Sequence, residues 1–143
     1  MRVKQSLIRM NKWQVDEKRR HLSDLLVLRD DMARKLAMLE ESLQREQALV
    51  RASADTNADV SHAYGVYAAS VIKQRENLKH SITAIDGQVN DAEAAITEAF
   101  QALKRQEAAL ASQQRREQKK REKKMQQELD ERALEQHRRR RRF

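Results

Sequence analysis

The chain of 143 residues contains no proline, no cysteine and only two glycines. Since Pro and Gly mark most turns, their near absence predicts a chain with very few turns. The lack of cysteine excludes disulfides, thiolate metal ligands and a cysteine nucleophile. Aromatic residues make up only 3% of the chain, whereas charged residues make up 36%. This composition, rich in Ala, Gln, Glu, Lys, Arg and Leu, is typical of long helices.

Long hydrophobic runs are also missing. No stretch approaches the roughly 20 apolar residues that span a bilayer. The first 13 residues, MRVKQSLIRMNKW, lack the continuous apolar core of a signal peptide. We therefore expect a soluble, intracellular protein of the cytoplasm.

The hydrophobic residues that are present form two ladders with a seven-residue repeat. This spacing, divided into steps of three and four, is the signature of a supercoiled helix seam. The first ladder consists of Ile8, Val15, Leu22, Leu25, Arg29, Met32, Leu36, Leu39, Leu43 and Val50. The second consists of Val71, Leu78, Ile82, Ile85, Val89, Ala92, Ile96, Ala99, Leu103 and Leu110.

The ladders predict a single all-α domain, an antiparallel coiled-coil hairpin. The first helix is expected over about residues 3–52, the turn over 53–63 and the paired part of the second helix over 64–112. The stretch 52–65 breaks the ladders and gathers Ser, Asp, Thr and Asn, which favour turns. Asp59 or Ser61 could cap the second helix. We expect a monomeric hairpin, because a parallel dimer would not explain this break, although a long-rod dimer or a domain-swapped pair remains open.

The register of the hairpin can be predicted by matching the ladders, because opposite residues in an antiparallel pair have numbers with a constant sum. A sum of 121 places Leu25 beside Ile96 and Leu36 beside Ile85. In this register each charged residue at a seam position has a suitable residue opposite it. Two further pairs set this register, Arg29 opposite Ala92 and Glu46 opposite Arg75, the latter as an ion pair. A sum of 114, one heptad away, would place both arginines against hydrocarbon, which is costly.

Charge is distributed unevenly along the chain. Residues 1–110 hold 17 Lys and Arg against 16 Asp and Glu, whereas residues 111–143 hold 13 against 6. The seam ends at Leu110, so we expect residues 113–143 to form an unpaired basic extension, either helical or disordered. Pairs at four-residue spacing, Glu117–Arg121 and Glu128–Arg132, would support a helix there.

Nothing in the sequence indicates catalysis, a cofactor or a small-molecule substrate. The four histidines, His21, His62, His80 and His137, are too scattered to hold a metal ion. The two glycines stand alone, so no glycine loop exists to cradle a phosphate. A narrow apolar seam cannot wall off a dry active site. We therefore expect that the protein is not an enzyme.

Two features suggest contacts with partners. Trp13 falls on the outward side of the first helix, with Met10 one turn before it, and Trp is favoured at interface hot spots. Trp13 could equally lie flat over neighbouring polar stems. The block 138–142 is five consecutive arginines, which suit bidentate contacts to carboxylates or phosphates, although a solubilising tail is the simpler alternative.

Three segments resemble the FliJ family of bacterial flagellar type III export. They are residues 7–22 (LIRMNKWQVDEKRRHL), 98–107 (EAFQALKRQE) and 129–139 (LDERALEQHRR). In the third, Arg132 separates the Asp-Glu pair from Ala133, a slight departure from the usual family ending. The length, the hairpin and the basic end agree with the family as well.

The resemblance implies a cytoplasmic stalk, peripherally associated with the membrane-embedded export apparatus. Family members resemble the central stalk of rotary ATPases and contact the export ATPase ring, the export gate and export chaperones. The residues implied for the ATPase ring are Trp13, Asp16, Arg19, Arg20, Asp130, Glu131, Arg138, Arg139, Arg140, Arg141 and Arg142. A weaker assignment to the gate covers Tyr67, Val71, Gln74 and Asn77.

Two rival functions remain. A basic coiled coil could bind nucleic acid, but the chain lacks a recognised fold or interleaved aromatic residues for reading bases. It could also be a generic structural coiled coil, which a stable parallel dimer would favour.

Overall fold

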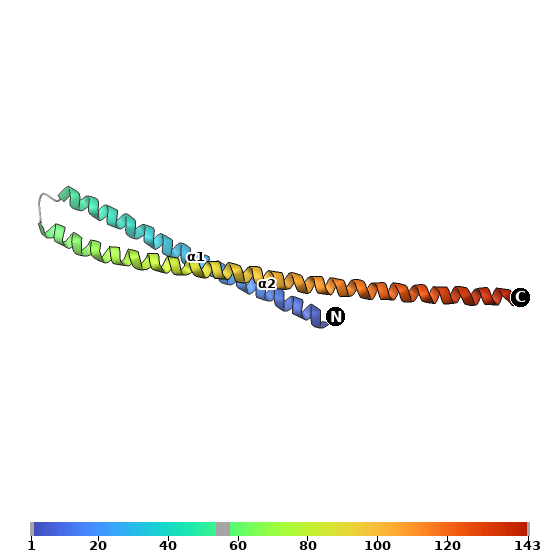
Figure 1. The fold of residues 1–143 in the computed structure, drawn as a ribbon. Helices are drawn as coiled ribbons and strands as arrows, with labels where there is room; N and C mark the ends of the chain where they lie inside the picture. The colour runs from blue at the N-terminus through green and yellow to red at the C-terminus, as the bar shows by residue number, and fades with distance from the viewer. Residues whose placement is uncertain (1, 54–57, 143) are drawn as a thin grey trace. The chain divides into compact units, whose positions relative to one another are not determined.

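The computed structural model describes residues 2–53 and 58–142, and in these ranges it contains two helices and no strand (Figure 1). Helix α1 spans Arg2–Ser53 and helix α2 spans Ala58–Arg141. Neither helix contains a proline, so each backbone can continue without interruption over 52 and 84 residues. The two helices pack against each other, which confirms the predicted all-α helical hairpin.

The chain divides into two compact units. The first, which we call the hairpin unit, is Val15–Glu98. The second, the terminal unit, combines Met1–Gln14 with Ala99–Phe143.

The buried residues match the predicted ladders. In the described ranges every buried hydrophobic side chain belongs to one of them, and none is less than 2% exposed. These residues are Ile8, Val15, Leu25, Val71, Ile85, Val89, Ala92 and Leu103. Burial on a single stripe leaves the rest of each helix in contact with solvent, as expected for a coiled coil.

The register within the hairpin unit differs from the prediction. Leu25 of α1 lies in one buried cluster with Ile85, Val89 and Ala92 of α2, and Leu22 and Met32 pack against it. Residues spaced as 85, 89 and 92 form the hole that receives a single knob from a facing helix. Ile96, the expected neighbour of Leu25, is not part of this cluster. The sum of 121 is therefore wrong, and the contacts fit the alternative sum of 114.

The contacts of Arg29 explain why the sum of 114, which was rejected on the sequence alone, is energetically acceptable. Its guanidinium forms an ion pair with Asp86, the residue after Ile85, so the charge is not left against hydrocarbon. Both side chains are nearly half exposed, so the long stem lies along the seam while the charged end stays in water. Ala92, the expected neighbour of Arg29, instead packs in the cluster with Leu25.

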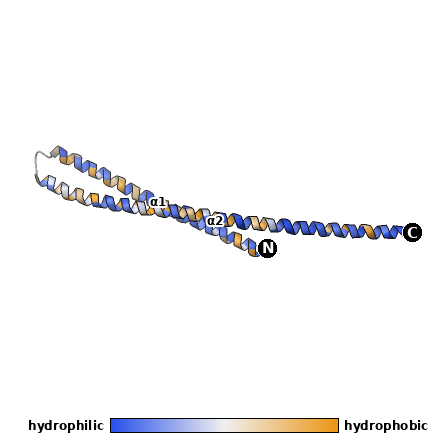
Figure 2. Cartoon of the chain, in the orientation of Figure 1, coloured by the Kyte–Doolittle hydropathy of each residue, from blue (hydrophilic) through white to orange (hydrophobic). Residues whose placement is uncertain are grey.

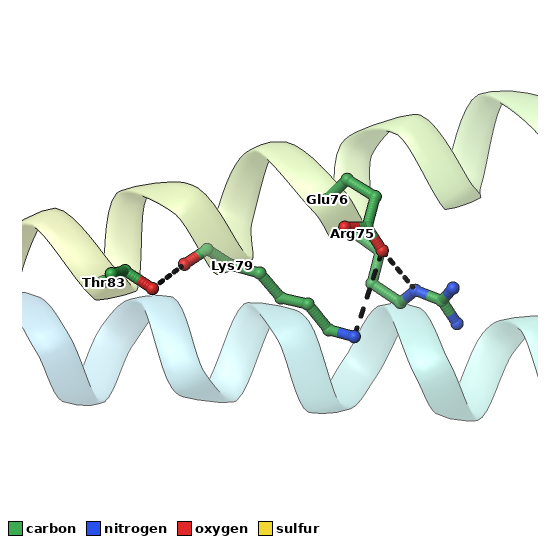
Figure 3. A network of polar contacts seen from close by, with 4 residues as sticks. All are labelled: Arg75, Glu76, Lys79 and Thr83. Atoms are coloured by element: carbon green, nitrogen blue, oxygen red, sulfur yellow. Dashed lines mark hydrogen bonds and ion pairs between the residues drawn. The ribbon is translucent and has the colours of Figure 1, made fainter.

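Arg75, the other arginine at a seam position, pairs with a neighbour on its own helix (Figure 3). Its Nε lies 3.7 Å from a carboxylate oxygen of Glu76, and Lys79 Nζ lies 4.0 Å from the same oxygen. The predicted ion pair between Arg75 and Glu46 is not formed between these two described residues, and Glu46 is exposed. Arg75 Nε is buried without a hydrogen bond.

The connection between the helices is shorter than predicted. α2 begins at Ala58 rather than at about residue 64, so Ser61, a proposed cap, lies inside the helix and Asp59 lies in its first turn. Residues 54–57, within the predicted turn, lie outside the described residues. The early start of α2 agrees with the lower constant sum of opposite residues.

In the terminal unit, the N-terminal part of α1 and the part of α2 after residue 98 form one compact unit. Ile8 and Leu103 are buried in it, and Leu110 is half-buried. Partial burial continues to Glu117, and from Gln118 to Arg142 every residue is exposed. The fully exposed part of the extension predicted over 113–143 is therefore residues 118–142, and from here on the name basic extension refers to these residues. It is helical to Arg141 and almost entirely hydrophilic (Figure 2).

Candidate functional site

The basic extension is a single helix stabilised by pairs along its own surface. Arg121 lies 4.0 Å from Glu117, as predicted, and Arg139 lies 3.2 Å from Glu135. The predicted pair of Glu128 and Arg132 is not formed between these two described residues. Such exposed pairs contribute only about 0.3–0.5 kcal/mol each. The helix is therefore supported locally and leaves most of its surface free for a partner.

The five arginines at the end of the extension are all exposed. Arg139 pairs with Glu135, whereas the other four form no ion pair with a described residue. A free guanidinium can make two parallel hydrogen bonds to a carboxylate or a phosphate. Arg138–Arg141 lie in the last turn of α2 and Arg142 follows its end, so the five side chains form a concentrated cationic surface.

Two acidic residues of the predicted site precede these arginines. Asp130 accepts a hydrogen bond from Gln126 Nε2 at 3.4 Å, and Glu131 is exposed. The extension thus presents carboxylates and guanidiniums in sequence along one helix. Such a pattern allows a partner to be recognised by alternating charge rather than by positive charge alone.

The N-terminal residues of the predicted site fall into both units. Trp13 is 62% exposed and belongs to the terminal unit, together with the basic extension. Asp16, Arg19 and Arg20 belong to the hairpin unit, where they are exposed and Arg20 pairs with Glu17 at 2.9 Å. The outward position predicted for Trp13 is confirmed. The structure therefore places Trp13 in the same unit as the extension, whereas Asp16, Arg19 and Arg20 lie in the other unit.

Among the residues assigned to the gate, Val71 has the wrong environment for a contact. It is only 5% exposed, because it occupies a seam position and packs between the helices. Tyr67, Gln74 and Asn77 are exposed and remain available to a partner. The assignment therefore fails at Val71, which its place in the second ladder already indicated.

An open groove in the hairpin unit was not predicted from the sequence. It has a volume of about 540 Å³. Its lining residues are Lys35, Met38, Leu39, Ser42, Gln74, Asn77 and Leu78. Met38, which directly precedes the seam residue Leu39, is 65% exposed. An exposed Met next to a ladder position is the sequence signal that could have revealed this groove.

The described residues hold no cluster of three or more His, Asp or Glu side chains that could bind a metal ion. Neither α1 nor α2, over the residues described, has a segment both long and apolar enough to cross a bilayer.

Comparisons with protein-family models, with curated proteins and with solved structures gave no match to this chain.

Proposed function

We propose that this chain is a non-enzymatic stalk and adaptor of a flagellar type III protein export apparatus. In this role the basic extension binds the ring of the export ATPase, and other helix surface connects the ring to the export gate and to export chaperones. The protein acts in the cytoplasm, at the membrane-embedded apparatus, and is a monomeric hairpin when free.

The observation that carries this proposal is the basic extension itself. It is the exposed last part of helix α2, beyond the partly buried part, and its final four residues are arginines that are followed by Arg142. A single helix is only about 10–12 Å in diameter, which suits insertion into the central opening of a ring. The resemblance of residues 7–22, 98–107 and 129–139 to the FliJ family supplies the identity of the ring.

The hairpin unit supports the second half of the proposal. The lining of its groove combines apolar residues, among them Leu39 and Leu78, with the polar residues Lys35, Gln74 and Asn77. Gln74 and Asn77 belong to the weaker assignment to the gate, and they line this groove. We therefore place the gate contact on the groove, with Met38 and Leu39 in place of the buried Val71.

Binding of the purified full-length chain to the export ATPase tests the main contact. A truncated chain ending at Glu117 removes the extension and keeps every buried residue of the seam. We expect the truncated chain to lose binding by at least about tenfold, since several charge-assisted hydrogen bonds disappear together. Undiminished binding by the truncated chain would overturn the assignment.

A second variant separates charge from length. Replacing Arg138–Arg142 by Gln keeps the helix and removes the cations. We expect weaker ATPase binding with less dependence on salt, because exposed charge pairs are screened. Equal binding of the Gln variant to duplex DNA and to the ATPase would favour neither the export function nor the nucleic-acid-binding function. Tight binding of the wild-type chain to any duplex, without an ATPase partner, would favour the nucleic-acid-binding function.

A further inference from the structure

The first helix carries a second apolar stripe, which faces away from the seam. Val3, Leu7 and Met10 are spaced by four and three residues, so they share one face of the helix, and Trp13 extends this face by three residues. Their exposed fractions are 74%, 41%, 52% and 62%. Ile8, on a different face, is buried. Residues 2–14 are therefore apolar on two faces, and only one of them is covered.

The same segment is purely basic. Residues 2–14 contain Arg2, Lys4, Arg9 and Lys12, and they contain no acidic residue. Arg2, Arg9 and Lys12 are exposed, and Lys4 is half-buried. On a helical projection Lys4 lies on one side of the stripe and Arg2 and Arg9 lie on the other. An exposed apolar stripe bordered by cations on both sides calls for a partner that is both apolar and anionic.

A second copy of the chain does not meet this requirement, because joining two stripes would bring the same cations together. An anionic bilayer does meet it. Trp and Met side chains can enter the boundary between headgroups and acyl chains, while Lys and Arg bind the anionic headgroups. The stripe is a convex ridge on a single helix, which a fluid surface accommodates without a preformed pocket.

We infer that residues 2–14 of α1 bind the surface of membranes that contain anionic lipids, with Leu7, Met10 and Trp13 inserted at the interface. Binding is peripheral, because the inserted side chains belong to a helix whose opposite face packs in the terminal unit. This contact does not rest on the proposed ATPase contact of the basic extension, and it assigns Trp13, which the resemblance placed at the ATPase ring, to the membrane surface instead.

Trp13 is the single tryptophan of the chain, so its fluorescence reports this contact directly. The full-length protein is mixed with vesicles of phosphatidylcholine alone or with phosphatidylglycerol added. We expect the emission to shift to shorter wavelength and acrylamide quenching to fall only with the anionic vesicles, and salt to reverse both changes. An unchanged emission with anionic vesicles would overturn the inference.

Matched variants distinguish the stripe from the extension. Leu7→Ser with Met10→Ser should lower the vesicle-bound fraction in sedimentation by about tenfold, because two apolar insertions are lost. Met125→Ser with Leu129→Ser removes two apolar side chains of similar exposure from the extension and should leave binding unchanged. Circular dichroism confirms that both variants keep their helices.

Two other results would contradict the inference. Vesicle binding that survives Leu7→Ser with Met10→Ser but is lost when Arg138–Arg142 become Gln would assign membrane contact to the extension. A Trp13 emission shift produced by the ATPase but by no vesicle would make the stripe a protein contact. Neither result changes the outcome of the ATPase truncation experiment, so the two proposals fail separately.

Discussion

Arg29 of α1 forms an ion pair with Asp86 of α2, the residue that follows the buried Ile85. The pair joins the two helices of the hairpin unit where a charged residue interrupts the apolar ladder. It shows how a cation at a seam position can reach a carboxylate on the flank of the facing helix. The register of the hairpin therefore does not require a small residue opposite Arg29.

The first prediction concerns this register. The natural chain has no cysteine, so engineered pairs can be read without background. We expect Leu25→Cys with Val89→Cys to form a disulfide within one chain under mild oxidation, because facing seam residues lie within reach of each other. Leu25→Cys with Ile96→Cys should not form one. Gel mobility without reductant measures both, and crosslinking of only the second pair, or only between chains, would contradict the hairpin described.

The second prediction concerns Arg75. Its Nε is buried without a hydrogen bond, and the cation lies at a seam position. Replacing Arg75 by Leu should raise the free energy of unfolding by about 1 kcal/mol, since an unsatisfied polar group is exchanged for an apolar contact. Urea unfolding followed by circular dichroism measures the change. Arg45→Leu, at an exposed ion pair with Glu41, is the control and should change stability by less than about 0.5 kcal/mol.

The third prediction concerns Gly87, which lies inside α2 with nothing within 4 Å of the position that a Cβ would occupy. Gly87→Ala should stabilise the hairpin by about 0.5–1 kcal/mol, because alanine loses less backbone entropy in a helix. Thermal unfolding measures the gain. The reverse change at a nearby exposed position, Ala84→Gly, should lower stability by a similar amount. A loss of stability in Gly87→Ala would show that this position needs glycine for a contact.

Much of the fold could be predicted from the sequence, because a seven-residue repeat assigns each apolar residue to the seam without knowledge of its partner. The register could not be predicted in this way. Ladders of identical period match equally well after a shift of one heptad, so only the charged exceptions distinguish the two alternatives. Arg29 and Arg75 are long enough to direct their cations to Asp86 and Glu76, and this option made the rejected register acceptable.

The candidate site was predictable to a lesser degree. The exposure of Trp13 followed from its place outside the ladder. The loss of apolar seam residues predicted the end of pairing near residue 112, whereas partial burial continues to Glu117. Val71 was assigned to a partner although its ladder position indicated burial. The groove beside Met38 is lined by side chains of two helices, so the exposed Met38 could indicate its α1 side, whereas its α2 side could be assigned only with the correct register.

The central claim is that the basic extension lies against the export ATPase ring, and site-specific photocrosslinking tests it most directly. A photoreactive residue is placed at Gln136, in the extension, or at Gln88, which is exposed in the hairpin unit. In cells that assemble the export apparatus, we expect Gln136 to crosslink to the ATPase and Gln88 not to do so. Crosslinking of the ATPase from Gln88 but not from Gln136 would contradict the account.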